Sequence, residues 1–345
     1  MKEQLPQDRR SFLKAMGGTT AVIAAVPVLF KSSPAQGAEA AVAAAQINRA
    51  FVAGKYAIEL DGVLAGWVSS VEGGHATADV VVEEMGTDFI ERKHIGAVKY
   101  EDITITCGAG MSQRFYNWIQ DSFDHKASKR NGAIVAADFN FKEVARLTFS
   151  NALITEIGFP TLDAASKDAA KMTVKFSPEY TSRQPGSSSA VQSKGTTDNR
   201  RWLPANFKLD IAKLDCSRVN KIEALTVKQK VTKSVVGDGQ DYVREAANLE
   251  IPNLIVTLPE VNAESFYAWH EDFVINGMNE SSSEKTGTLS WLENNGNALG
   301  SLKFSGLGIF KCAPDKVEAG SDSIRRVKAE MYCEEITFNF KASWA

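Results

Sequence analysis

The chain has 345 residues, of which 44% are hydrophobic and 23% are charged, a composition typical of globular proteins with enough apolar residues for two cores of common size. The formal net charge is −3, so the chain has no global basic field and nucleic acid is not favoured as a partner. None of the four cysteines lies in a CxxC pair or at a zinc-type Cys/His spacing, which argues against a structural metal site; they are Cys107, Cys216, Cys312 and Cys333.

The first forty residues have the organisation of an export signal. A pair of arginines precedes a mild apolar run at residues 15–30, which is shorter than the roughly 20 residues that a bilayer-spanning helix needs. This order resembles a twin-arginine signal, although Asp8 stands where serine or threonine is usual. The residues expected to carry the signal are Arg9, Arg10, Phe12 and Leu13.

A cleavage site is predicted directly after this run. Ala38 and Ala40 flank Glu39 in an A-x-A pattern. We therefore predict that residues 1–40 are an export signal, with the twin-arginine translocase as a partner and a periplasmic, extracellular or cell-surface destination. Membrane attachment is expected only if the signal stays uncleaved. An oxidising compartment permits disulfides among the four cysteines, and three full connectivities stay open.

Alternation of apolar and polar residues then dominates the chain. Apolar residues at every second position predict antiparallel strands with one buried and one wet face. In the first half these are Tyr56, Ile58 and Leu60; Ile103, Ile105 and Cys107; and Met172, Val174 and Phe176. In the second half they are Phe207, Leu209 and Ile211; Val327, Ala329 and Met331; and Ile336, Phe338 and Phe340. Asp61-Gly62 predicts a tight turn of a hairpin between Tyr56 and Val71.

Residues 71–97 are long for a connection inside a compact domain. They place three consecutive β-branched residues, Val80, Val81 and Val82, among charged ones. Long connections of this kind are usually functional. We predict a projecting hairpin that pairs with a neighbouring molecule.

One short helix is predicted in each half. Phe115, Trp118, Ile119 and Phe123 recur at helical spacing after Met111, with Ser112 as the N-cap. Phe266, Trp269, His270 and Phe273 do the same, with Asn262 as the cap. A binding box for a ligand is the alternative interpretation of these aromatic faces. We favour a plug over the open end of a β-barrel, because apolar helix faces are usually core.

The halves repeat the same order of elements. The two Phe-Tyr-x-Trp motifs are 151 positions apart (266 − 115), and the later strands align Phe149 with Phe304 at a separation of 155 (304 − 149). The predicted domains are 51–180 and 201–345, joined by a polar linker or mobile loop at 181–200.

Catalytic motifs are missing from the sequence. The four histidines show no HxxxH or HExxH spacing, and there is no GxSxG elbow, P-loop or GxGxxG after a strand. The acidic doublets Glu83-Glu84 and Glu334-Glu335 place neighbours on opposite strand faces. We therefore predict a protein that is not an enzyme and has neither cofactor nor metal.

Residues 98–123 resemble the signature of the tail tube family of contractile phages. In that family a Lys-Tyr-x-x-Ile-Thr strand leads through a glycine-containing turn to a short helix with an aromatic residue and tryptophan. The matching residues are Lys99, Tyr100, Ile103, Thr104, Gly108, Gly110 and Trp118. The strand around Asn151-Ala152 resembles a further element of the family. The resemblance covers about residues 51–180 well and about 206–340 weakly, where the Lys-Tyr and Asn-Ala elements are missing.

The resemblance implies a mainly β protein with minor α content, built as two tandem tail-tube-like β-barrels, each with one short flanking helix. Such barrels associate by sheet edges into rings that stack into a tube. The expected function is a non-catalytic structural protein, exported in folded form, whose partner is itself, in a trimeric ring of pseudo-sixfold symmetry or a filament. The alternatives are an exported monomeric binding or scaffold protein and, third, a twin-arginine-exported enzyme.

Overall fold

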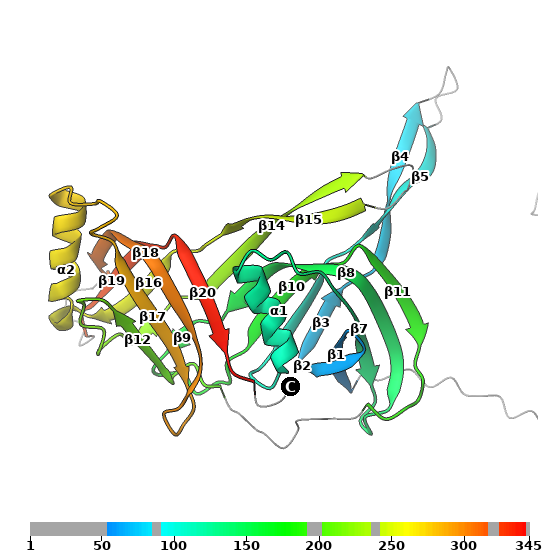
Figure 1. Cartoon of the computed structure of the whole chain (residues 1–345), viewed down its shortest axis with the longest axis horizontal. Coiled ribbons are helices and arrows are strands. Elements are labelled where there is room, and N and C mark those ends of the chain that lie inside the picture. The colour runs from blue at the N-terminus through cyan, green and yellow to red at the C-terminus, as the bar shows by residue number, and fades with distance from the viewer. Residues whose placement is uncertain (1–53, 85–90, 192–201, 236–241, 317–323, 343–345) are drawn as a thin grey trace, which may run out of the picture. The chain divides into compact units, whose positions relative to one another are not determined.

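The computed structural model describes residues 54–84, 91–191, 202–235, 242–316 and 324–342 (Figure 1). The export-signal residues Arg9, Arg10, Phe12, Leu13, Ala38 and Ala40 lie outside these ranges. The described chain is mainly β, as the sequence predicts.

The first sheet is built mostly from the first half of the chain. Its strands from that half are β1 (Lys55–Leu60), β2 (Val63–Val68), β3 (Ser70–Gly73), β6 (Ile103–Cys107), β7 (Arg130–Ala137), β8 (Glu143–Phe159), β10 (Met172–Ser177) and β11 (Tyr180–Pro185). Their order is β2-β1-β7-β8-β10-β6-β3, with β11 added to β8. Because β2 and β3 end this order and are consecutive in the chain, the sheet curls back on itself as a nearly closed barrel.

The second sheet is built mostly from the second half. Its strands from that half are β12 (Phe207–Ile211), β13 (Lys221–Ile222), β16 (Leu254–Pro259), β17 (Lys285–Leu292), β18 (Ala298–Pro314), β19 (Arg326–Tyr332) and β20 (Glu335–Phe340). Their order is β12-β17-β18-β19-β16-β13, with β20 added to β18.

Two connections cross between the halves. The short strand β9 (Leu162–Asp163) belongs to the first half but pairs with β13 in the second sheet. The hairpin of β14 (Leu225–Val235) and β15 (Tyr242–Glu250) belongs to the second half but pairs with β8 in the first sheet. Another hairpin, β4 (Ala76–Glu84) with β5 (Glu91–Tyr100), forms a two-stranded sheet of its own.

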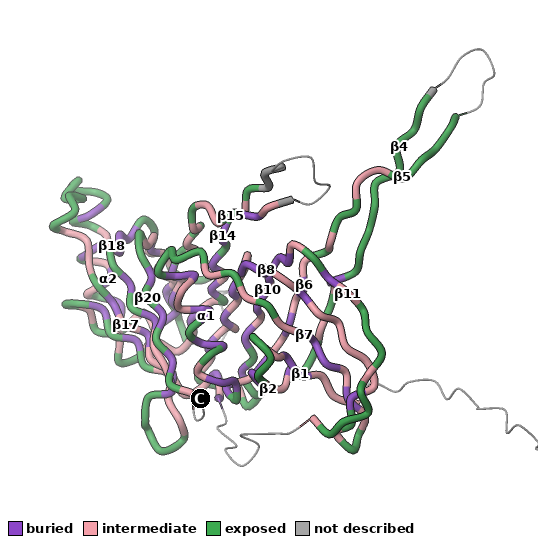
Figure 2. The backbone as a smooth tube through the Cα atoms, turned by 45° about the vertical axis from the view of Figure 1, so that its right-hand side comes forward, coloured by how far each residue is buried: buried purple, intermediate pink, exposed green. Residues whose placement is uncertain are grey.

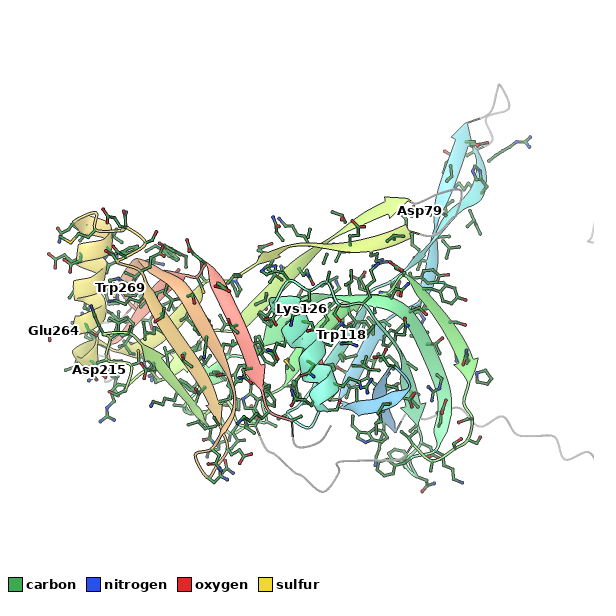
Figure 3. The ribbon with its side chains drawn as sticks, viewed as in Figure 1. Asp79, Trp118, Lys126, Asp215, Glu264 and Trp269 are labelled. Atoms are coloured by element: carbon green, nitrogen blue, oxygen red, sulfur yellow. The ribbon has the colours of Figure 1, made fainter. Side chains whose placement is uncertain are left out.

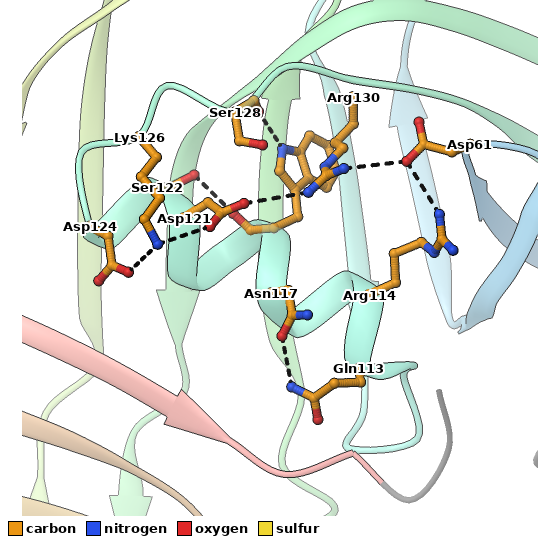
Figure 4. Close-up of polar contacts among 11 residues, drawn as sticks. Asp61, Gln113, Arg114, Asn117, Asp121, Ser122, Asp124, Lys126, Ser128 and Arg130 are labelled. Atoms are coloured by element: carbon orange, nitrogen blue, oxygen red, sulfur yellow. Dashed lines mark hydrogen bonds and ion pairs between the residues drawn. The ribbon is translucent and has the colours of Figure 1, made fainter.

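The first helix forms as predicted. Helix α1 spans Gln113–Phe123, and the hydroxyl of Ser112 accepts a hydrogen bond from the backbone N–H of Phe115, which confirms the N-cap. Phe115, Trp118 and Ile119 are fully buried. The indole N–H of Trp118 donates to the carbonyl of Ser128, so the aromatic face is core rather than a ligand box (Figure 4).

The second helix begins differently from the prediction. A 3-10 turn, η2 (Glu260–Asn262), precedes α2 (Glu264–His270), and a π-helical turn, η3 (Glu271–Ile275), follows it. Asn262 is therefore the last residue of the 3-10 turn, and Ala263 occupies the N-cap position without a side-chain hydrogen bond. The prediction of Asn262 as the cap was wrong, because the turn before the helix already satisfies the N–H of Ala263 through Glu260. Trp118 of α1 and Trp269 of α2 are both buried (Figure 3).

The segment predicted as a linker begins within a strand. Its first residues, up to Pro185, lie in β11 and pair with β8, while residues 192–201 are outside the described chain. The sequence did not predict this strand, because its residues are mostly polar. The domain boundaries at 180 and 201 stay predictions.

The internal repeat extends to individual registers. Val71 lies opposite Ile105, and Ile222 lies opposite Val256, so both pairs are separated by 151 positions (222 − 71 and 256 − 105). Gly132 lies opposite Phe149, and Gly287 lies opposite Phe304, at 155 positions (287 − 132). A residue up to Phe123 therefore has its equivalent 151 positions later, and a residue from Arg130 onward has it 155 positions later.

The interior is apolar and shared between the halves. Buried side chains of both sheets form one hydrophobic cluster that runs from Trp118 and Phe176 to Trp291 and Phe338. Figure 2 shows the buried strands of this cluster and the exposed β4–β5 hairpin. All four cysteine thiols are free. In the described chain, no three His, Cys, Asp or Glu side chains gather as a metal ion would need, and no helix has the length and apolar character to cross a membrane.

Candidate assembly interface

The β4–β5 hairpin, called here the projecting hairpin, is exposed and carries β-branched side chains among charged ones. Among the described strands β4 pairs only with β5, in a ladder from Ala76↔Tyr100 to Glu84↔Glu91. Val80 is 63% exposed, Val82 48% and Ile95 75%. Exposed β-branched residues on an unpaired strand edge are typical of a surface that pairs with another chain. The structure thus places Val80, Val81 and Val82 on a projecting hairpin, and their role in assembly stays a prediction.

A pair of glycines directs this hairpin away from the barrel. Gly73 has φ 85° and Gly74 has φ 82°, a conformation that other residues rarely adopt. A Cβ on Gly73 would lie 2.0 Å from the carbonyl oxygen of Asp102. In the second half the equivalent positions are Ala224 and Leu225, where the chain runs from β13 into β14 without left-handed residues.

The β14–β15 hairpin, called here the seated hairpin, is the equivalent element of the second half. It lies on the first barrel, because β14 adds to β8 in the register Leu225↔Phe159, Thr226↔Gly158, Val227↔Ile157 and Lys228↔Glu156. Leu225 and Val227 are buried there. The two halves are therefore joined edge to edge by strand addition.

Arg244 fixes the far part of the seated hairpin. Its guanidinium donates to Oδ1 of Asp102 at 3.2 Å and to the carbonyl of Tyr100 at 3.0 Å, and the residue is 6% exposed. Burial lowers the pKa of Arg244, and the charges of Asp102 and Glu179 oppose that effect. A buried cation with matched acceptors specifies one position of the hairpin on the barrel.

Glu179, on the first barrel, binds the seated hairpin. Its carboxylate accepts from the backbone N–H of Arg244 at 2.9 Å, from Nζ of Lys129 at 2.7 Å and from Nδ2 of Asn151 at 2.7 Å. Burial on its own would raise the pKa of Glu179, but the hydrogen bonds from these three donors outweigh it and lower the pKa. The carboxylate is thus held ionised at the junction.

Aromatic contacts complete the junction. Tyr116 of α1 stacks on Phe340 of β20 with ring centroids 4.1 Å apart. Phe159, at the end of β8, stacks on Trp291 of the second sheet at 5.2 Å. Stacked aromatic pairs add to the area that the junction buries. The junction is therefore apolar in its centre and charged beside the hairpin.

The residues of the sequence motif run from the end of the projecting hairpin through β6 to α1. Lys99 and Tyr100 end β5, Ile103 and Thr104 lie on β6, Gly108 is in the turn before α1, and Trp118 is on α1. Lys99 forms an ion pair with Asp79, and the ring of Tyr100 meets Tyr180 edge to face at 5.2 Å. The carbonyl of Tyr100 takes part in the junction, because it accepts from Arg244.

Sequence reasoning did not identify Arg244, Asp102 or Glu179. Their side chains come from different halves, so no short motif links them. The available signal was positional, because Glu179 and Glu334 precede the final strand of each half at the 155-residue offset.

Comparisons with known proteins concern the first half. Residues 52–182 match the family described as T4-like virus tail tube protein gp19. This match confirms the resemblance read from the sequence motif and agrees with a structural rather than a catalytic protein. No curated protein matches the sequence.

Several solved structures are similar to part of the chain. The sheath-tube complex of an extracellular contractile injection system (PVC) in the extended state shares 19% identity over 40% of this chain and 94% of that chain, with a TM-score of 0.36. The anti-feeding prophage baseplate shares 12% identity over 39% and 91%, with a TM-score of 0.32. The tube terminating cap of the anti-feeding prophage shares 19% identity over 42% and 99%, with a TM-score of 0.35.

Proposed function

We propose, on the premise that residues 52–182 belong to the T4-like tail tube protein family, that this chain is a structural subunit that assembles through its sheet edges into a ring or tube. One observation carries the proposal. The two halves of a single chain are already joined by strand addition, β14 to β8, across an apolar junction. A molecule that already contains one such contact between its two sheets is equipped to repeat it between copies.

The stoichiometry follows from the repeat. Each chain supplies two tube-like units, so three chains give six units around a ring of pseudo-sixfold symmetry. The contact between chains is heterologous, since it joins the first half of one copy to the second half of the next. A heterologous contact closes into a ring when its rotation is correct and otherwise forms a filament.

Assembly is tested by size and shape. The purified full chain is measured by chromatography with light scattering and imaged by negative-stain microscopy. We expect particles of about three chains or more with a central hole. A single species near the formula mass of 37.5 kDa at all concentrations would contradict the proposal and favour the monomeric binding protein.

The same proposal includes export of the folded chain by the twin-arginine pathway, supported by Arg9, Arg10 and the Ala38–Ala40 cleavage pattern. Replacement of both arginines by lysine is expected to abolish periplasmic accumulation, whereas Lys14→Arg in the same segment leaves it unchanged. Equal periplasmic fractions of the double variant and the wild type would refute export by this pathway.

A further inference from the structure

The projecting and seated hairpins are equivalent elements in different situations. The seated hairpin lies on the first barrel, while the projecting hairpin has no strand partner outside itself among the described residues. Both are two-stranded, and their first strands end at equivalent positions, because Glu84 at the end of β4 and Val235 at the end of β14 are 151 positions apart. The projecting hairpin therefore lacks the contact that its counterpart makes.

An acceptor for this hairpin lies on the second half. Strand β8 receives the seated hairpin along Glu156–Phe159, just beyond the stretch that pairs with β7. The equivalent stretch of β18 is Lys311–Pro314, which lies beyond the stretch that pairs with β17. Within the described chain this stretch pairs with β19 alone, on one edge. We call its other edge the acceptor edge.

We propose that β4 of one copy adds to the acceptor edge of β18 in the next copy, in the register that β14 and β8 show within one chain. This proposal rests on the proposed function and specifies its contact. The expected partners across the copies are Gly74↔Pro314, His75↔Ala313, Ala76↔Cys312 and Thr77↔Lys311. In each pair the first residue lies 151 positions before the observed residue of β14, and the second lies 155 positions after the observed residue of β8. The partner of the projecting hairpin is thus a second copy of this chain.

The charged groups beside the two edges match. Lys93 of β5 is the equivalent of Arg244, and Glu334 is the equivalent of Glu179. Both are exposed in the single chain, whereas Arg244 is buried and the side chain of Glu179 is 14% exposed at the seated hairpin. At the seated hairpin the backbone N–H of Arg244 donates to Glu179, whose charge also acts on the guanidinium. The pairing of β4 with β18 therefore brings the backbone N–H of Lys93, and with it the cation, toward the carboxylate of Glu334.

A cavity of the first barrel lies at the base of the projecting hairpin. It has a volume of about 510 Å³ and is lined by residues that include Tyr56, Gly74, Ala136 and Arg183. The equivalent positions in the second half hold large side chains, namely Phe207, Leu225, Trp291 and Phe338. Phe159, at the end of β8, stacks on Trp291 there. Pro314 is the equivalent of Phe159, so the end of β18 from the neighbouring copy covers this cavity.

A native cysteine makes the register directly testable. In Ala76→Cys the new thiol lies opposite Cys312 of the next copy, at the Cα separation of directly opposed strand residues, about 4.5–5.5 Å, which a disulfide spans. Under mild oxidation of the full chain we expect covalent dimers and trimers on non-reducing gels. Thr77→Cys is the matched control, because its side chain is on the other face of β4. Cys312→Ser in the Ala76→Cys background is expected to remove the cross-link.

The size of the reduced Ala76→Cys protein separates the possible results. Assemblies that cross-link through Cys312 support the proposal. Assemblies without this cross-link, or with an equal cross-link from Thr77→Cys, overturn the proposed register and leave the ring or tube function standing. A single-chain species that never cross-links overturns both.

Discussion

The two hairpins are equivalent elements of one repeat that lie in different surroundings. The seated hairpin carries Val227, Gln229 and Arg244, which are buried at the junction, and it ties the halves of the chain together. The projecting hairpin carries Val80, Val82 and Ile95 at the surface. Equivalent backbones therefore differ in which side chains they bury, as expected if one contact is permanent and the other is the proposed contact between copies.

The backbone at the base of each hairpin differs as well. Gly73 and Gly74 take left-handed conformations before β4, whereas Ala224 and Leu225 lead directly into β14. The carbonyl of Gly74 accepts from the hydroxyl of Thr181 at 2.8 Å, so the turn is held in place. The glycine pair thus gives the projecting hairpin its own fixed direction.

The largest expected contrast comes from the same substitution in both hairpins. Val227→Asp places an unpaired charge in the buried junction and is expected to destabilise the chain by about 3 kcal/mol or more. Ala76→Asp, 151 positions earlier on an exposed strand, is expected to leave stability unchanged within about 0.5 kcal/mol but to prevent assembly. Thermal or urea unfolding and light scattering measure the two effects. Equal destabilisation by both substitutions would show that the two positions are equally buried in the single chain.

The comparison also shows what the sequence can predict. Alternation identified β1, β6, β10, β12 and β19, and Asp61-Gly62 marked the β1–β2 turn, where both residues have positive φ. These features are local, so residue spacing reveals them. The 155-residue alignment of Phe149 with Phe304 also identified β8 and β18 as equivalents.

The crossing of strands between the halves could not be predicted in this way. Neither the pairing of β14 with β8 nor that of β9 with β13 leaves a periodic signal, because it depends on which edges are free after each half has folded. Arg244 and its partners Asp102 and Glu179 were missed for the same reason. The projecting hairpin was predicted because its exposed valines contrast with its charged neighbours within one short segment.

Loss of the buried arginine is the next largest effect. Arg244→Ala removes hydrogen bonds to Asp102 and Tyr100 and is expected to cost about 2 kcal/mol, in the range for hydrogen bonds to charged groups. Lys93→Ala at the equivalent position is expected to leave unfolding unchanged and to weaken assembly. Urea unfolding of both variants as single chains tests the pair. A loss of stability in Lys93→Ala as large as in Arg244→Ala would contradict the equivalence.

The glycine turn gives a smaller and more specific contrast. Gly73→Ala adds a clash with the carbonyl of Asp102 to the cost of a left-handed alanine, and we expect a loss of about 2–3 kcal/mol. Gly62→Ala is the control, because Gly62 has φ 78° with no atom within 4 Å of its Cβ position, and only about 1 kcal/mol is expected. The difference between the two unfolding free energies measures the clash. If the two variants lose equal stability, the close approach to Asp102 does not constrain the turn.

The smallest expected effect is a pH dependence of the unfolding free energy that Glu179 contributes and its equivalent Glu334 does not. The folded-state pKa of Glu179 is lowered below its ordinary value of 4.5, so its contribution is present above that value and is lost as pH falls through the folded pKa. Glu179→Gln is therefore expected to be less stable than the wild type by about 1 kcal/mol at pH 7, and this difference should shrink as the pH is lowered below 4.5. Glu334→Gln, on the exposed acceptor side, is expected to leave the stability of the single chain unchanged at pH 7. Urea unfolding across this pH range measures the difference for both variants. A constant difference in stability between Glu179→Gln and the wild type from pH 7 to pH 3 would mean that the junction does not hold Glu179 ionised. The contrast between the seated and the projecting hairpin would then rest on packing alone.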